Sequence, residues 1–273
     1  MTTPAAPKRS DLPQRLISAA IGIPLLAGVV WLGGYTTGVV AALAALIAAN
    51  ELLLLVGRAG WRPLRNEGLL WGLAIVAAAP FGGLWVLAAL GAGFLALLIA
   101  AGAIRRSAVF IGDAIFTAVP TAYAALPLAT LVLLRDGTAG LQWVILVFAA
   151  TFATDTGAYT VGRLIGRHKM APSISPGKTW EGAVGGLLSA IGATIGVIVL
   201  VDEIPTLYAQ AAGLGIAIGV ISQIGDLAES KLKRVARVKD SGILIPGHGG
   251  LMDRLDSLVL VFPVVYAASR LWD

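Results

Sequence analysis

Residues 35–57 have the sequence YTTGVVAALAALIAANELLLLVG, in which Glu51 is the single charged residue among 23 positions. A helix that crosses a membrane needs about 20 consecutive and mostly apolar residues. This stretch is therefore long enough and apolar enough to cross a bilayer as one helix. It indicates a helical membrane protein, and the rest of the sequence can be compared with that expectation.

The apolar character extends over the whole chain. Hydrophobic residues make up 58% of the sequence and charged residues 13%, whereas soluble domains have about 45–50% apolar and about 25% charged residues. We expect an all-α polytopic integral membrane protein with about nine transmembrane helices. The other eight candidate spans lie near 13–33, 68–82, 84–104, 108–134, 139–162, 182–201, 205–228 and 252–271. The first is interpreted as a retained span, because a second span follows it at once.

The basic residues predict the orientation. If the N-terminus is cytoplasmic and nine spans alternate, 18 of the 20 Lys and Arg residues are cytoplasmic, and only Arg135 and Arg270 lie outside. This bias is what the positive-inside rule predicts. We therefore expect a multi-pass protein of a bacterial cytoplasmic membrane, with its C-terminus outside. Topology accounts for most of the net charge of +5, so we do not expect a nucleic-acid partner.

Polar residues divide the chain into two parts. Residues 1–134 form about five apolar helices, which we expect to act as a scaffold and to make dimer contacts. Residues 135–273 form about four helices and contain almost every unusual polar residue, so a cytoplasm-facing catalytic cavity is expected there. Glu51 lies near the cytoplasmic end of its span and is interpreted as a residue at the membrane interface. The chain has no cysteines, which excludes disulfides, thiolate nucleophiles and Cys-based zinc sites.

Asp155 is an ionisable residue within a predicted span. Such residues are rare, because each costs roughly 2.5–3.5 kcal/mol at the centre of a membrane helix. Asp155, Tyr159 and Arg163 are spaced at i, i+4 and i+8, and so share one helix face. Two interpretations remain open: Asp155 is a structural partner of Arg163, or it lines a polar cavity that opens to the cytoplasm.

Residues 173–182, SISPGKTWEG, precede the seventh predicted span. Gly177, Lys178 and Thr179 resemble the end of a phosphate-binding P-loop, but the first glycine of that motif would fall on Pro172, so the motif does not match. A glycine turn with lysine and hydroxyl side chains beside a helix start can nevertheless bind a phosphate. The alternative interpretation is a basic loop that ends in a helix cap.

The most informative segment covers residues 225–256. Four polar residues share a face at the end of the eighth span, and two aspartates share a face at the start of the ninth: Asp226, Glu229, Ser230 and Lys233, then Asp253 and Asp256. The same segment contains six basic residues, one of which is Lys233. Carboxylates without thiols suit Mg²⁺, which proteins hold with a few carboxylates and substrate phosphates, and the basic residues suit a polyphosphate. Capping of the last helix is the alternative role for Asp253, but the pattern as a whole favours a membrane-embedded phosphoryl or nucleotidyl transferase.

Three stretches carry a family resemblance. The sequences SKLKR at 230–234, KDSG at 239–242 and PGHGGLMDRLD at 246–256 together resemble the full signature of the phosphatidate cytidylyltransferase (CDP-diacylglycerol synthase) family. The stretches DTGAY at 155–159 and SPGKT at 175–179 are also similar to that family. The resemblance covers nearly the whole chain and is weaker before residue 110.

The resemblance implies a reaction in which CTP and phosphatidic acid give CDP-diacylglycerol and pyrophosphate with Mg²⁺, catalysed by a helical membrane homodimer. It implies that Asp226 and Asp253 bind the metal, and a second cation, divalent or K⁺, would use Asp240 or Asp256. The residues expected to be catalytic are Asp226, Asp253, Lys233, Lys239 and Asp240. Those expected to bind substrate are Asp155, Tyr159, Arg163, Ser175, Lys178, Thr179, Ser230, Arg234, His248, Gly249, Gly250 and Arg254.

Two other functions fit parts of the pattern. A related CTP-dependent membrane enzyme would act on another lipid, as a polyprenol kinase or an ether-lipid cytidylyltransferase. A membrane transporter would show inverted repeats and charges at the membrane centre, whereas the polar residues here gather at one side and in one half of the chain. The motif of CDP-alcohol phosphotransferases is not found.

Overall fold

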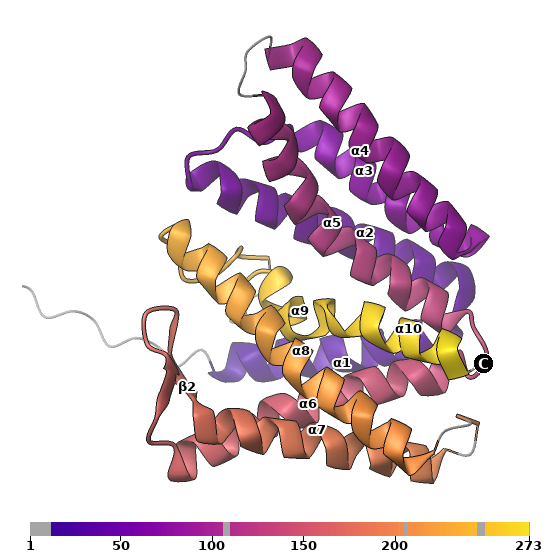
Figure 1. Cartoon of the computed structure of the whole chain (residues 1–273), viewed down its shortest axis with the longest axis vertical. Helices are drawn as coiled ribbons and strands as arrows, with labels where there is room; N and C mark the ends of the chain where they lie inside the picture. The colour runs from indigo at the N-terminus through magenta and orange to yellow at the C-terminus, as the bar shows by residue number, and fades with distance from the viewer. Residues whose placement is uncertain (1–11, 106–109, 202, 205–206, 245–248, 273) are drawn as a thin grey trace, which may run out of the picture.

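The computed structural model describes residues 12–105, 110–201, 203–204, 207–244 and 249–272, with the backbone alone at 12–19 and 105. The described chain is mainly helical, as predicted (Figure 1). The helices are α1 (Leu12–Leu32), α2 (Gly34–Arg58), α3 (Arg65–Ala77), α4 (Gly83–Arg105), α5 (Phe110–Arg135), α6 (Gly140–Ile165), α7 (Trp180–Leu200), α8 (Tyr208–Val235), α9 (Met252–Val259) and α10 (Val261–Trp272), with a 3₁₀ turn, η1, at Ala79–Phe81.

Seven helical segments of the described chain are long and apolar enough to cross a membrane. They are α2, α4, α5, α6, α7, α8 and the consecutive pair α9–α10, which together form one span, Met252–Trp272. α3 has only 13 residues, because a 3₁₀ turn with Pro80 follows it and Gly82 then adopts φ +106°. The protein is therefore a polytopic helical membrane protein, while the count of nine spans and the orientation stay predictions.

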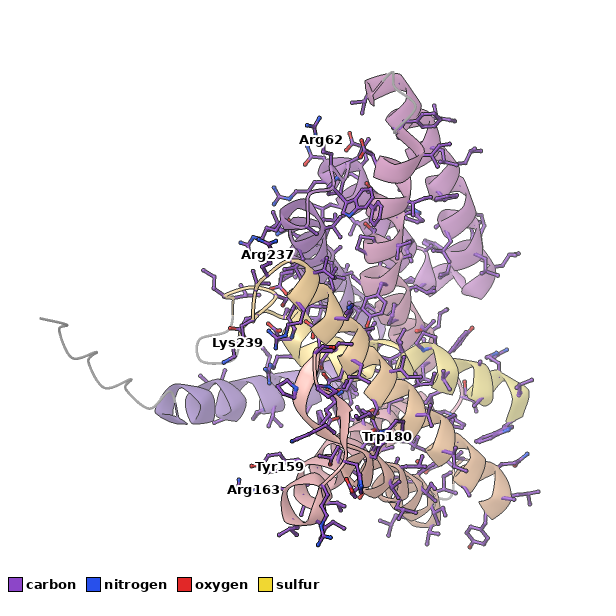
Figure 2. All side chains as sticks on the ribbon, turned by 60° about the vertical axis from the view of Figure 1, so that its left-hand side comes forward. Arg62, Tyr159, Arg163, Trp180, Arg237 and Lys239 are labelled. Atoms are coloured by element: carbon purple, nitrogen blue, oxygen red, sulfur yellow. The ribbon has the colours of Figure 1, made fainter. Side chains whose placement is uncertain are left out.

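The helices form two groups that meet at the C-terminal pair. In Figure 1, α2–α5 lie together in the upper part and α6 and α7 in the lower part, with α9 and α10 between them, while α8 runs diagonally from the lower right to the left. We call α1–α5 the N-terminal region and α6–α10 the C-terminal region. The C-terminal ends of α2, α6 and α8 lie on the left of Figure 1, and the C-terminus of the chain lies on the right. Figure 2 shows Arg62, Arg163, Arg237 and Lys239 on one side of the molecule, which is therefore its basic end.

Small residues allow α6 and α7 to pack closely. A Cβ atom on Gly182 would lie 2.7 Å from the carbonyl oxygen of Ala158, and one on Gly186 would lie 2.8 Å from that of Thr154. Real Cβ atoms do not approach other atoms so closely, so the two backbones can meet only because these positions are glycine. Close helix contact through small residues is typical of membrane proteins. It places Asp155, on α6, beside the start of α7.

A two-stranded antiparallel hairpin, which the sequence analysis does not predict, connects α6 to α7. It consists of β1 (Lys169–Ala171) and β2 (Ser175–Thr179). Thr179 is the N-cap of α7, and its hydroxyl accepts a hydrogen bond from the Gly182 amide at 3.1 Å. The Trp180 amide donates to the His168 carbonyl at 2.9 Å. The hairpin is therefore fixed to the start of α7, and β2 carries Lys178 in a defined position.

Candidate active site

A cavity of about 660 Å³ lies between α6, the hairpin, α7, α8 and α9. It brings together ten of the predicted site residues: Asp155, Tyr159, Arg163, Ser175, Lys178, Thr179, Asp226, Asp253, Arg254 and Asp256. Lys169, Gln223 and Ser257 also line it, and the sequence analysis did not select them. Motifs separated by up to 100 positions therefore form one polar site within the C-terminal region.

Asp226 and Lys178 form an ion pair across this cavity. The Lys178 ammonium lies 2.8 Å from Asp226 Oδ2, and it also donates to the Gln223 carbonyl at 3.5 Å. Ser230 donates to Asp226 Oδ1 at 3.3 Å. Lys178 lies on the hairpin and Asp226 on α8, so the contact joins two of the predicted motifs. Both side chains are partly accessible from the cavity.

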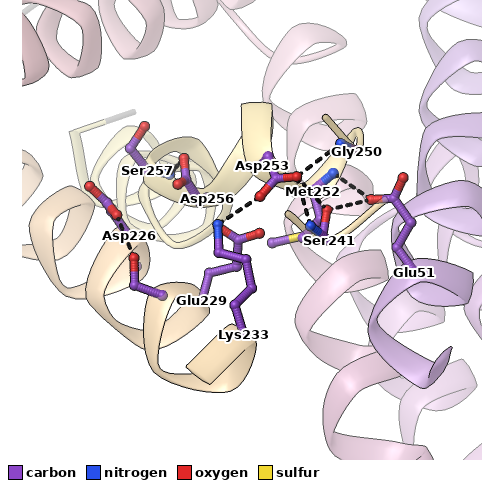
Figure 3. A network of polar contacts seen from close by, with 12 residues as sticks. Glu51, Asp226, Glu229, Lys233, Ser241, Gly250, Met252, Asp253, Asp256 and Ser257 are labelled. Atoms are coloured by element: carbon purple, nitrogen blue, oxygen red, sulfur yellow. Dashed lines mark hydrogen bonds and ion pairs between the residues drawn. The ribbon is translucent and has the colours of Figure 1, made fainter. Parts of the chain in front are cut away.

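Asp253 is buried at the start of α9 and is held by several donors (Figure 3). Its Oδ2 accepts from the Ser241 amide at 2.8 Å, from the Gly250 amide at 2.9 Å and from the Ser241 hydroxyl at 3.0 Å. Its Oδ1 lies 2.6 Å from the Lys233 ammonium, which lies 3.0 Å from Glu229 Oε2. The bond with Gly250 ties Asp253 to the connector before α9 and does not cap a helix amide, whereas the ion pair with Lys233 fits a role in the site.

Glu229 on α8 contributes a further carboxylate, which pairs with Lys233. It is 1% exposed, and its Oε1 has no hydrogen-bond partner among the described residues. Figure 3 shows Lys233 between Glu229 and Asp253, with Asp256 beside them. Four carboxylates, those of Asp226, Glu229, Asp253 and Asp256, thus gather around two lysines. The sequence analysis had placed Glu229 on the same helix face as Lys233 without giving it a role.

The carboxylates fit a magnesium ion that also binds a substrate. Among the described residues, no group of three or more His, Cys, Asp or Glu side chains could hold a metal ion. Mg²⁺ usually takes one or two carboxylates together with substrate phosphates and water. Asp226 and Asp253 come from different helices, line the same cavity and offer only oxygen atoms. The residues present therefore suit this mode of binding.

Asp155 forms its hydrogen bond with α9. Its Oδ2 accepts from the Ser257 hydroxyl at 3.1 Å, while Arg163 donates to the Tyr159 hydroxyl at 2.6 Å. The pairing of Asp155 with Arg163, one of the two interpretations left open, is thus not formed among the described residues. All three side chains line the same cavity, as the other interpretation expects, and the opening of that cavity to the cytoplasm stays a prediction.

Several predicted site residues do not line this cavity: Ser230, Lys233, Arg234, Lys239, Asp240, Gly249 and Gly250. Ser230, Lys233 and Gly250 support its carboxylates, and Arg234 donates to the Ile174 carbonyl at 3.1 Å, which ties α8 to the hairpin. Asp240 instead lines a separate pocket of about 570 Å³ against α2, because the connector after α8 turns towards the N-terminal region. Lys239 is exposed. His248 lies outside the described residues.

The structure adds Glu51, which the sequence analysis had interpreted as a residue at the membrane interface. Glu51 is buried with 6% exposure. It accepts hydrogen bonds from the Ser241 hydroxyl, the Leu251 amide and the Met252 amide at 2.9, 3.0 and 2.9 Å. Its presence in an apolar span was a signal, because such a residue needs a partner. Its partners could not be found from sequence, since they lie 190 to 201 positions away.

Comparisons with known proteins identify the family of this chain. A model of the cytidylyltransferase family matches residues 13–272. A Staphylococcus haemolyticus protein named phosphatidate cytidylyltransferase is 33% identical over 256 residues, which are 92% of this chain and 96% of that protein. Proteins of the same name from Staphylococcus saprophyticus and Brucella melitensis are 44% and 43% identical over 126 and 150 residues, and these matches cover 48% and 53% of the relatives. Because the family match extends over nearly the whole sequence, the chain belongs to the cytidylyltransferase family.

Proposed function

We propose that this protein transfers the cytidylyl group of CTP to phosphatidic acid and forms CDP-diacylglycerol and pyrophosphate. Family membership and the names of the relatives support this activity. The observation that carries it is the cavity at the ends of membrane helices, which is lined by Lys178, Asp226 and Asp253 from separate motifs. Lys178 pairs with Asp226, and Asp253 pairs with Lys233 next to the cavity. Such a site offers both positive charge for phosphates and oxygen ligands for a cation.

The proposed transfer step does not require the protein to supply a nucleophile. An oxygen of the lipid phosphate attacks the α-phosphorus of CTP, a new P–O bond forms, and the bond from that phosphorus to the β-phosphate oxygen breaks. The electron pair leaves with pyrophosphate. The attacking phosphate is already ionised, so no protein nucleophile or strong base is needed. The main tasks are to position two anions and to neutralise their charge, as in phosphoryl transfer generally.

The cavity residues suit these tasks. Arg163, Lys169, Lys178 and Arg254 line the cavity, and their positive charges can bind the phosphates of both substrates. Asp226 and Asp253 would hold Mg²⁺, whose chemistry here is to neutralise the triphosphate. Asp256 remains as a candidate ligand for a second cation, divalent or K⁺, whereas Asp240 lines the other pocket.

We place the cavity at the cytoplasmic face of the membrane. The labelled Arg62, Arg163, Arg237 and Lys239 lie on one side of the molecule (Figure 2), and the positive-inside rule assigns such a side to the cytoplasm. CTP would then enter from the cytoplasm, while the lipid enters sideways and its acyl chains stay in the bilayer. We expect the active form to be a homodimer, as the family resemblance implies.

The proposal is tested by incubating purified, detergent-solubilised protein with labelled CTP, phosphatidic acid and Mg²⁺. Label should enter a lipid only when all three are present. If label entered a polyprenol but not phosphatidic acid, the protein would act on another lipid and the proposed acceptor would be wrong. If folded protein left CTP unchanged with every lipid, the enzymatic proposal would be wrong and transport would become the leading interpretation.

A further inference from the structure

Glu51 joins the N-terminal region to the segment that carries the cavity carboxylates. Its carboxylate lies on α2. It contacts Ser241 and Leu251 in the connector between α8 and α9, and Met252 at the start of α9. A Cβ atom on Gly242 or Gly250 would lie 2.5 Å from one of the Glu51 oxygens. These glycines therefore leave the space that the carboxylate occupies. The hydrogen bonds to Glu51 and the space left for it by the two glycines indicate a specific contact rather than a chance one. We call Glu51 and its partners Ser241, Leu251 and Met252 the junction.

The junction holds the first turn of α9. The first amides of a helix have no partner within the helix, and the helix dipole favours a negative charge there. Glu51 accepts from the amides of Leu251 and Met252, which begin α9. This helix has only eight residues, and four of them, Asp253, Arg254, Asp256 and Ser257, line the cavity. A shift at its start would therefore move several cavity groups together.

Ser241 connects Glu51 directly to Asp253 (Figure 3). Its hydroxyl lies 2.9 Å from Glu51 Oε2 and 3.0 Å from Asp253 Oδ2. A hydroxyl has one proton and donates it to one acceptor at a time, so the two carboxylates share a single donor. The Ser241 amide also donates to Asp253. The orientation of the Asp253 carboxylate thus depends on a residue that Glu51 holds.

We propose that Glu51 is a positioning residue that fixes Asp253 and the start of α9 for the reaction. The effect of Glu51 on turnover rests on the proposed function, whereas its effect on the positions of Asp253 and α9 does not. It gives the N-terminal region a direct role in the site, beyond that of a scaffold. Residues that orient a metal-binding group typically change metal affinity or activity by about 10–100-fold when they are replaced.

Glu51→Gln is the informative variant, because glutamine has the same shape and one acceptor oxygen fewer. Whichever way its amide is turned, either the Leu251 amide or the Met252 amide faces an NH₂ group instead of an oxygen. Glu67→Gln is the matched control. Glu67 also lies in the N-terminal region, on α3, and forms none of the described hydrogen bonds of the junction.

The kinetic test measures kcat, both KM values and the Mg²⁺ concentration for half-maximal activity. Glu51→Gln should lower kcat about 10–100-fold and raise the Mg²⁺ requirement, while KM for phosphatidic acid changes less than about twofold. The double variant with Ser241→Ala should lose less than the product of the two single losses, because both act on Asp253. Glu67→Gln should match the wild type. An unchanged kcat, or a loss that only follows a smaller folded fraction in thermal unfolding, would overturn the inference.

Hydrogen–deuterium exchange without substrate separates this inference from the proposed function. Exchange is resolved to single amides in the full-length protein in detergent. Glu51→Gln should speed exchange at Leu251 and Met252, and also at Ser241 and Gly250, whose amides bond to Asp253. Faster exchange at Leu251 and Met252 alone would contradict positioning, even in an active enzyme. If the wild type formed no CDP-diacylglycerol, the exchange result would still decide whether Glu51 positions Asp253.

Discussion

Glu51 of the N-terminal region and Asp226 of the C-terminal region are carboxylates in opposite surroundings. Glu51 is buried, and its described partners are three donors from the connector and the start of α9. In the C-terminal region, Asp226 faces a lysine in a cavity of about 660 Å³. A buried carboxylate whose oxygens accept hydrogen bonds from the protein stabilises the arrangement of the segments around it. A carboxylate at a cavity can exchange its protein partner for a ligand. For this pair of residues, the difference favours a chemical role for Asp226 and a positioning role for Glu51.

The largest effect is expected when the cavity carboxylate loses its charge. Asp226→Asn removes the partner of Lys178 and one of two carboxylates assigned to Mg²⁺, so kcat should fall by about 10²–10³, as for other charge-stabilising groups. Asp136→Asn is the matched control, because Asp136 is exposed between α5 and α6 and does not line the cavity. Formation of labelled CDP-diacylglycerol measures both. Equal activity of the two variants would contradict the assignment of Asp226 to the reaction.

The next largest effect is expected at Lys178, the lysine on β2 of the hairpin. Lys178→Ala should raise KM for CTP at least about tenfold, because a hydrogen bond to a charged group contributes about 1.5–3 kcal/mol and 1.4 kcal/mol is a factor of ten. Lys231→Ala, at an exposed position on α8 outside the cavity lining, should leave KM near the wild-type value. A lower kcat with normal KM for CTP would instead assign Lys178 to the transition state.

Helix packing in the C-terminal region should be more sensitive than its lipid-facing surface. Gly186→Ala brings a Cβ atom to 2.8 Å from the Thr154 carbonyl oxygen, and overpacking of this kind costs about 1–3 kcal/mol. Gly192→Ala on the same helix meets no atom within 4 Å and should be neutral or slightly stabilising. Thermal unfolding in detergent compares the two. The account of α6–α7 packing fails if both variants unfold at the same temperature.

The smallest effect is expected at the rim of the cavity. Tyr159→Phe removes the hydroxyl that accepts from Arg163 at 2.6 Å, and both side chains are exposed. Because both groups are exposed to solvent, water can replace the lost partner of Arg163, so kcat/KM for CTP should fall only a few-fold. A loss as large as that of Asp226→Asn would show that the rim takes part in catalysis.

Sequence reasoning found the membrane class and most of the cavity, because both depend on local signals. Apolar stretches define spans, and Asp155, Lys178, Asp226 and Asp253 stand in short polar motifs. It missed the hairpin at 169–179, since strands of three and five residues carry no clear alternation. It also could not pair Glu51 with Ser241 or place Asp240 outside the cavity. Those facts depend on how α2 meets the connector, which no local pattern specifies.

The central claim is that the C-terminal cavity transfers a cytidylyl group, and the position of a phosphorus label tests it most directly. The protein would be given phosphatidic acid, Mg²⁺ and CTP labelled at either the α- or the γ-phosphate. The account predicts that only the α-label enters the lipid, that the γ-label appears in pyrophosphate, and that Asp226→Asn slows the appearance of both labelled products by about 10²–10³. Entry of the γ-label into a lipid would show a kinase reaction and would contradict the account.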